Sequence, residues 1–158
     1  MDHRRALTQR GLTLVELLVV VGITIAMLAI ALPVTQSGDL AGSEARRFLA
    51  DAMRARSAAR TRWEPTQIRV NAKKGQWVLE TTSGEVIPGP GMDELGRRFL
   101  VDGVNFKKIT LRQRDFIFLP NGRTLRNASI YIQSGDSTWK ITGSALSGML
   151  ESEPVEIP

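Results

Sequence analysis

The chain has 158 residues, of which 21 are Lys or Arg, 16 are Asp or Glu, one is His and none is Cys. A chain of this length holds one domain with an appendage. Because there is no cysteine and His3 is the single histidine, disulfides, thiol chemistry and Cys/His metal sites are excluded, and general acid–base catalysis lacks its commonest residue. We therefore expect a protein that is not an enzyme and that holds no cofactor and no metal.

The first strong signal is an apolar run close to the N-terminus. Residues 12–34 carry a single charge, at Glu16, and a helix of that length covers about 35 Å, which is enough to cross a bilayer. Three arginines precede the run, and the next basic residue, Arg46, comes well after it. The positive-inside rule then predicts a single-pass protein of the cytoplasmic (inner) membrane, with a cytoplasmic N-terminus and an exported remainder.

Two other interpretations of this run stay open. A secretory signal peptide has a basic start and a small-residue cleavage site, which Ala29-Ile30-Ala31 imitates, and its removal would release a soluble domain that begins at Leu32. Its apolar stretch is normally shorter, however, and carries no carboxylate such as Glu16. A buried core helix is the second alternative, but the run is longer than a small core can cover.

The residues around Glu16 carry a more specific pattern. An ionisable group in a membrane helix costs about 2.5 to 3.5 kcal/mol on insertion scales, so its presence indicates a function. The string Arg10-Gly11-Leu12-Thr13-Leu14-Val15-Glu16-Leu17, with Pro33 downstream, resembles the class III signal of type IV prepilins and type II secretion pseudopilins. In that family a basic leader ends in Gly, prepilin peptidase cuts after the Gly, and Glu stands fifth in the mature chain.

The resemblance implies both processing and assembly. It implies a cut between Gly11 and Leu12, followed by N-methylation of Leu12 by the same peptidase. It also implies that the new terminal amine pairs with the Glu16 carboxylate of a neighbouring subunit, because leaving either buried charge alone would be strongly unfavourable. The implied partners are other pilin or pseudopilin subunits, prepilin peptidase, the inner-membrane assembly platform and, before assembly, the lipid bilayer.

A second helix is expected after a short break, capped by Asp39 and ending at about Arg62. Its apolar residues recur at spacings of three and four, so they form one stripe that can pack on a sheet. The stripe consists of Leu40, Ala41, Ala45, Phe48, Leu49, Ala52, Met53 and Ala59. We expect the opposite, arginine-rich face to be solvated, with Glu44 and Asp51 on it and with Arg47 four residues before Asp51.

Beyond Arg62 the apolar pattern changes from helical to alternating, which is typical of strands. Asn121-Gly122 is the strongest short hairpin signal. A short turn of helix is expected at Met92–Arg98, and residues 147–158 are expected to be loosely held. The expected strands are Thr66–Asn71, Gln76–Thr82, Asn105–Arg112, Asp115–Leu119, Ser129–Gln133 and Thr138–Thr142.

The resemblance to pilins implies an α+β fold, in which one long N-terminal helix packs on an antiparallel β-sheet head. The segment Asp115–Gly143, with Phe118-Leu119-Pro120-Asn121-Gly122 and two closing strands, is similar to GspH/FimT-type minor pseudopilins. A hairpin of any β-sandwich is the alternative for that segment. The expected parts are a prepilin leader at 1–11, a transmembrane stem at 12–34, the second half of the stem helix at 35–62 and the β-rich head at 63–158.

The resemblance therefore implies a minor pilin or pseudopilin, in a type IV pilus or a type II secretion pseudopilus, and the stem does not separate these two machines. The alternative function is a minor pilin that captures DNA for natural transformation through backbone phosphates. DNA-binding relatives tend to carry Gly-Arg-x-Arg near the C-terminus, whereas this chain reads Gly143-Ser144-Ala145-Leu146 there. The candidate DNA-binding residues are Arg123, Arg126, Arg46, Arg47 and Arg54, and the lesser candidates are Lys73, Lys74, Lys107 and Lys108.

Overall fold

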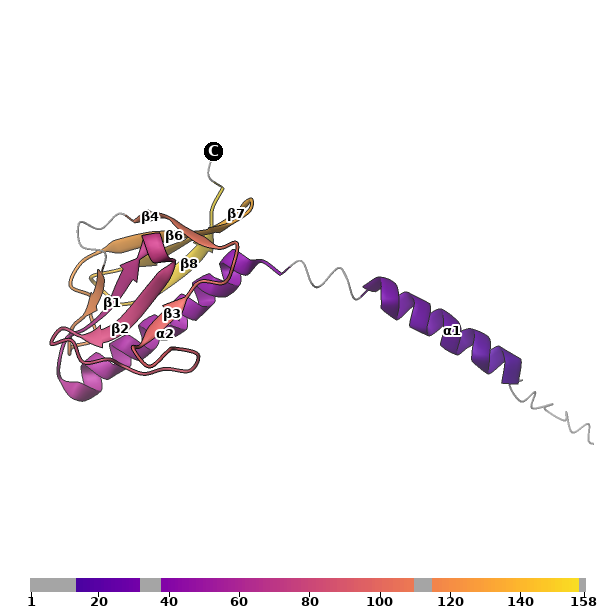
Figure 1. Ribbon diagram of the computed structural model, residues 1–158, viewed down its shortest axis with the longest axis horizontal. Coiled ribbons are helices and arrows are strands. Elements are labelled where there is room, and N and C mark those ends of the chain that lie inside the picture. The colour runs from indigo at the N-terminus through magenta and orange to yellow at the C-terminus, as the bar shows by residue number, and fades with distance from the viewer. Residues whose placement is uncertain (1–13, 32–37, 110–114, 157–158) are drawn as a thin grey trace, which may run out of the picture. The chain divides into compact units, whose positions relative to one another are not determined.

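The computed structural model describes residues 14–31, 38–109 and 115–156 (Figure 1). The chain divides into two compact units, Met1–Gly38 and Asp39–Pro158. The first unit contributes the helix α1 (Leu14–Ala31). The described residues of the second unit form the helix α2 (Leu40–Arg62), a short 3₁₀ turn (Ala72–Lys74) and the strands β1 to β8.

The helix α1 lies inside the apolar run of the sequence. Its apolar side chains are exposed in the first unit as far as Ile25, including Leu14 at 76% and Leu18 at 63%. Within the described ranges, no helix is long and apolar enough to cross a membrane. Gly11, Leu12 and Pro33 lie outside the described residues.

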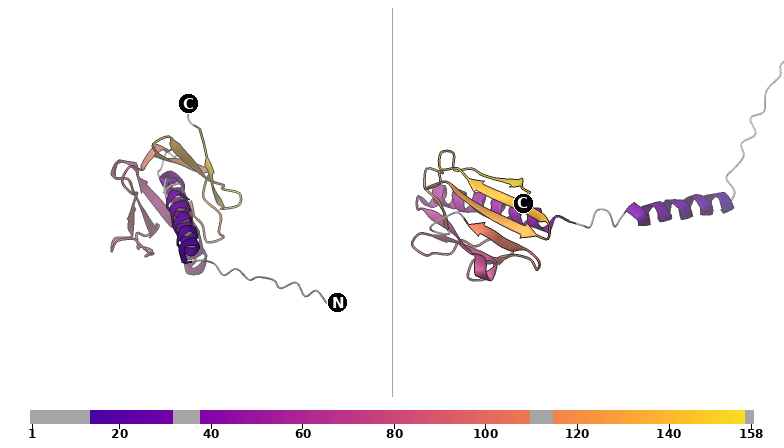
Figure 2. Two further views of the ribbon diagram at one scale, coloured as in Figure 1. Left: turned by 90° about the vertical axis from the view of Figure 1, so that its right-hand side faces the viewer. Right: turned by 90° about the horizontal axis from the view of Figure 1, so that it is seen from above.

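The strands of the second unit form two antiparallel sheets of four strands each. One sheet has the order β3-β2-β1-β5 and the other has the order β4-β6-β7-β8. The helix α2 contacts strands of both sheets, and the right-hand view of Figure 2 shows it running along the strands. The first sheet consists of β1 (Thr66–Asn71), β2 (Gln76–Thr81), β3 (Arg97–Phe99) and β5 (Asp115–Phe118). The second consists of β4 (Asn105–Ile109), β6 (Ala128–Ser134), β7 (Ser137–Gly143) and β8 (Leu150–Pro154).

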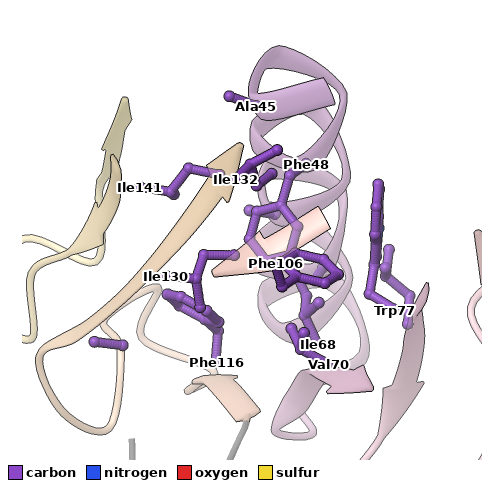
Figure 3. Close-up of a cluster of buried hydrophobic side chains, with 14 of the residues drawn as sticks. Ala45, Phe48, Ile68, Val70, Trp77, Phe106, Phe116, Ile130, Ile132 and Ile141 are labelled. Carbon is purple, nitrogen blue, oxygen red and sulfur yellow. The ribbon is translucent and has the colours of Figure 1, made fainter. Parts of the chain in front are cut away.

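The hydrophobic core fills the space between α2 and the two sheets. Phe48 projects from α2 into this core (Figure 3), and its ring centroid lies 5.4 Å from those of both Trp77 and Phe116. Isoleucines from β6 and β7, namely Ile130, Ile132 and Ile141, close the other side. All described core residues come from Ala41 or later, so the second unit has a complete core of its own.

Most expected elements are confirmed. The helix α2 begins after Asp39 and ends at Arg62, and β1, β2, β5, β6 and β7 match their expected ranges to within a residue at each end. The described part of β4 ends at Ile109, and the following residues of that expected strand lie outside the described ranges.

Two local expectations are wrong. The segment Met92–Arg98 forms no helical turn, because the Asp93 carboxylate accepts hydrogen bonds from the backbone N–H groups of Leu95 and Arg97 and leads the chain into β3. Such local side-chain bonds compete with helix formation. The acidic C-terminal segment is also ordered, as β8, because its backbone pairs with β7 at an edge where the glutamates face solvent.

The head contains two sheets where the sequence suggested one. The turn at Asn121-Gly122 does form, with the N–H of Gly122 donating to the carbonyl of Leu119 at 2.8 Å. The turn closes a short antiparallel hairpin, in which Phe118 forms a bridge with Thr124 and the N–H of Leu119 donates to the carbonyl of Arg123 at 2.8 Å. The pairing ends there, because β5 pairs with β1 whereas β6 pairs with β4 and β7. Beyond this short hairpin the chain passes from one sheet to the other, and the turn at Gly135 joins the longer hairpin of β6 and β7.

Candidate functional site

Glu16, the expected assembly residue, lies in the first turn of α1. Its neighbours Val15 and Leu17 are apolar and are 68% and 59% exposed. A carboxylate near a helix N-terminus is favoured by the helix dipole. Because Gly11 and Leu12 lie outside the described residues, the cleavage, the methylation and the pairing of Glu16 stay predictions.

The start of α2 is fastened to β7 through Asp39. The Asp39 carboxylate accepts hydrogen bonds from the N–H of Gly42 at 2.9 Å, from the hydroxyl of Ser137 at 2.7 Å and from the indole N–H of Trp139 at 2.6 Å. Burial raises the pKa of Asp39, but these three hydrogen bonds and the nearby Arg46 guanidinium together hold that pKa below its ordinary value. A side chain at position 42 would collide with this cluster, since a Cβ there would lie 2.8 Å from the Trp139 ring.

Neutralising this cap should weaken the head in a pH-dependent way. We expect Asp39→Asn to lower the free energy of unfolding by roughly 1 kcal/mol near pH 6, because Asn still caps the helix but accepts weaker hydrogen bonds. Since the folded pKa is lowered, the carboxylate contributes stability above the ordinary pKa of 3.8 and loses it as the pH falls through the folded value. Urea unfolding between pH 6 and pH 2.5 should show the gap between parent and variant closing with acid, and a constant gap would contradict this origin.

A buried ionic network centred on Asp51 joins the middle of α2 to the first sheet. Asp51 is 1% exposed, and its carboxylate accepts hydrogen bonds from the indole N–H of Trp77 at 2.9 Å and from Arg54 at 2.9 Å. Arg98, from β3, donates to both oxygens of the same carboxylate, at 2.7 and 3.2 Å. Arg98 also donates to the carbonyls of Pro90 and Gly91, so the network fixes the loop before β3 as well.

The expected solvated face of α2 is therefore partly wrong. Glu44 and Asp51 are both 1% exposed, and Arg47 pairs with Glu44 rather than with Asp51. Two residues of the expected apolar stripe, Leu40 and Met53, are instead exposed. Asp51 is buried because its carboxylate faces Trp77 of β2 and Arg98 of β3, on the first of the two sheets that α2 contacts.

Of the candidate DNA-binding residues, Arg47 and Arg54 have their charge compensated by carboxylates. Arg47 and Arg54 lie on one face of α2, but each is paired with a carboxylate three residues earlier. Arg46 stacks over the Trp139 ring at 5.9 Å, and Arg123 donates to the carbonyl of Ala145 at 3.3 Å. Exposed positions are also held by Arg126, Lys73, Lys74 and Lys107. Among the described residues, no group of three His, Asp or Glu side chains could hold a metal ion.

A basic groove at the C-terminal end of α2 was not predicted from the sequence. Its volume is about 600 Å³, and it lies between α2 and the turn at Asn121. Arg56, Arg60 and Trp63 are spaced four and three residues apart, which places them on one helical face and is the signal that could have revealed it. The described lining consists of Met53, Arg56, Ser57, Arg60, Thr61, Trp63, Pro120 and Asn121.

Comparisons with known proteins agree on the kind of head this is. The family model described as "Type II transport protein GspH" matches residues 44–147, which include most of α2 and β1 to β7. The minor pseudopilin EpsH from the type 2 secretion system of Vibrio cholerae has a similar structure, with a TM-score of 0.54 and 12% identity over 75% of this chain and 98% of that one. The type IV minor pilin FimU of Pseudomonas aeruginosa has a TM-score of 0.55 and 18% identity over 72% of this chain and 92% of that one. At these identities the two structures share the fold, and no curated protein matches the chain.

Proposed function

The chain belongs to the GspH family of type II transport proteins, and on that premise we propose that it is processed by prepilin peptidase and assembled as a subunit of an envelope filament. It is a minor pseudopilin or pilin of the type II secretion or type IV pilus kind. The resemblance stated from the sequence is confirmed at this level. The filament is a pseudopilus or a pilus, and the family is one of structural subunits.

The observation that carries this proposal is the family match across α2 and seven strands of the head. The proposal of a processed, inserted stem is supported by the sequence, in which an apolar run with one carboxylate follows a basic leader that ends at Gly11. On this view residues 12–34 hold the subunit in the inner membrane before assembly, with the head outside the cytoplasm. The peptidase and an inner-membrane assembly platform are its first partners.

Glu16 has a defined task in this proposal. After cleavage, the positive amine of Leu12 and the negative carboxylate of Glu16 are two charges in an apolar stem, and each would be costly without a partner. Pairing between neighbouring subunits compensates both charges and sets the register of one stem against the next.

A DNA-capturing role is not proposed. Neither the GspH match nor the two similar structures supports it. Two of the candidate cations, Arg47 and Arg54, already neutralise carboxylates of α2, which leaves less charge for phosphate groups.

N-terminal analysis of the membrane protein tests the processing step. We expect intact mass and N-terminal sequencing to show a chain that begins at N-methylated Leu12 when prepilin peptidase is present, and an uncut chain when it is absent. Gly11→Val should give the uncut chain in both cases, since the peptidase requires a small residue before the cut. A chain that begins at Leu32, with or without the peptidase, would mean a secreted domain and would contradict the proposal.

A further inference from the structure

The basic groove at the C-terminal end of α2 combines exposed apolar and cationic side chains. Trp63 and Met53 line it and are 80% and 62% exposed, respectively. Arg56 and Arg60 line the same groove, and none of its described lining residues is acidic. None of these four side chains belongs to the hydrophobic core or to the apolar stem.

The two arginines differ in how firmly they are held. The guanidinium of Arg56 donates to the carbonyl of Gly122 at 2.7 Å and to that of Ser147 at 3.2 Å, which fixes its position. Arg60 is exposed and makes no ion pair with any described residue, whereas Arg62 nearby is paired with Glu85 at 2.6 Å. The groove therefore offers one fixed cation and one that is able to turn towards a ligand.

Trp63 has a backbone conformation that is unusual for a tryptophan. It ends α2 with φ 54° and ψ 27°, and it is the only non-glycine residue with positive φ in the described part of the chain. Helices usually place Gly in this left-handed conformation, because a bulky side chain is strained there. Since the Trp63 side chain is 80% exposed, core packing does not offset that strain, and such strain at an exposed residue indicates a function.

The chemistry of the groove favours a polypeptide ligand. Tryptophan and arginine are the residues most enriched at the energetic centres of protein interfaces. A nucleic acid backbone would need a row of available cations, but the arginines before and after the groove, Arg54 and Arg62, are already in ion pairs. Charge complementarity with Arg56 and Arg60 requires carboxylates on the partner.

We propose that this groove binds an acidic polypeptide segment on the head of a neighbouring subunit. Its carboxylates lie on Arg56 and Arg60, and an apolar side chain between them packs against Trp63 and Met53. The inference rests on the proposed function, because a filament supplies neighbouring heads.

A short synthetic peptide tests the groove directly. The probe is Glu-Ser-Glu-Pro-Val-Glu, the sequence of residues 151–156 of this chain, and the control is the same peptide with Gln at each Glu. With the full chain in detergent micelles, we expect the acidic peptide to shift the amide resonances of Arg56, Arg60 and Trp63 and to move tryptophan emission to shorter wavelengths. The Gln peptide should bind about tenfold more weakly or not at all, and high salt should weaken the binding of the acidic peptide.

Variants separate a binding role from a structural one. Arg60→Glu should weaken peptide binding by about tenfold or more, while Lys74→Glu, an equal charge change at an exposed site on the 3₁₀ turn, should leave it within about twofold. Trp63→Gly should abolish binding without lowering the melting temperature, because Gly adopts positive φ without strain. If Trp63 had only a structural role, replacing it would lower the melting temperature.

Several results would overturn the inference. One is that the acidic peptide does not bind. Another is that Arg60→Glu and Lys74→Glu bind it equally well. The third is that the groove binds duplex DNA instead of the peptide. N-terminal analysis of the same preparation reports on the proposed function separately. If the chain begins at Leu12 but does not bind the peptide, only the proposal for the groove is overturned. If the chain is uncut but binds the peptide, only the proposal of processing is overturned.

Discussion

Replacing Asp51 by Ala should lower the free energy of unfolding of the head by about 3 to 5 kcal/mol. The Asp51 carboxylate is the shared acceptor for Trp77, Arg54 and Arg98, and Arg98 is only 7% exposed. Without the carboxylate, a buried guanidinium and a buried indole N–H are left without their main acceptor, and both pay a desolvation cost. Urea unfolding at pH 7, followed by circular dichroism, measures the loss.

Two controls distinguish the buried network from a general effect of losing a carboxylate. Glu85→Ala breaks the ion pair with Arg62, in which the Glu85 side chain is 63% exposed, and should cost less than about 1 kcal/mol. The double variant Asp51→Leu with Arg98→Met removes both charges and should recover much of the loss. If Asp51→Ala is no more destabilised than Glu85→Ala, the network contributes little to stability.

Replacing Glu16 by Ala should leave processing intact and reduce incorporation into filaments by about tenfold or more. The reason is electrostatic, because the amine of Leu12 would enter an apolar stem without a carboxylate, and an unpaired charge there costs at least the roughly 1.4 kcal/mol that a tenfold change represents. The fraction of the protein in sheared filaments, relative to the membrane fraction, measures incorporation.

A matched control comes from the same helix. Thr24 is a polar residue of α1 whose hydroxyl donates to the carbonyl of Val20 at 2.7 Å, so it is satisfied within its own helix. Thr24→Ala should therefore incorporate as the parent does. Normal incorporation of Glu16→Ala would contradict charge pairing as the basis of assembly, even if N-terminal analysis shows the expected cut after Gly11.

The elements that the sequence predicted correctly are those whose signals are local. The helix α2 follows from the Asp39 cap and from apolar residues at spacings of three and four, and β1, β2 and β5 to β7 follow from alternation. The family also followed from local strings, namely the leader with Gly11 and Glu16 and the Phe118-Leu119-Pro120-Asn121-Gly122 segment, and the GspH match confirms it.

The tertiary structure alone decided which local elements meet. The edge strands β3 and β8 have weak patterns of their own and are ordered by pairing with β2 and β7, and the two flanking strands of the Asn121-Gly122 turn separate into different sheets. Asp51 looked like a solvated helix residue because its partner Arg98 lies far along the chain. The groove likewise forms only where the turn at Asn121 lies beside Arg60 and Trp63, which are distant from it in sequence. Periodicity reports which face of an element is apolar, but burial and charge pairing depend on neighbours that are distant in sequence.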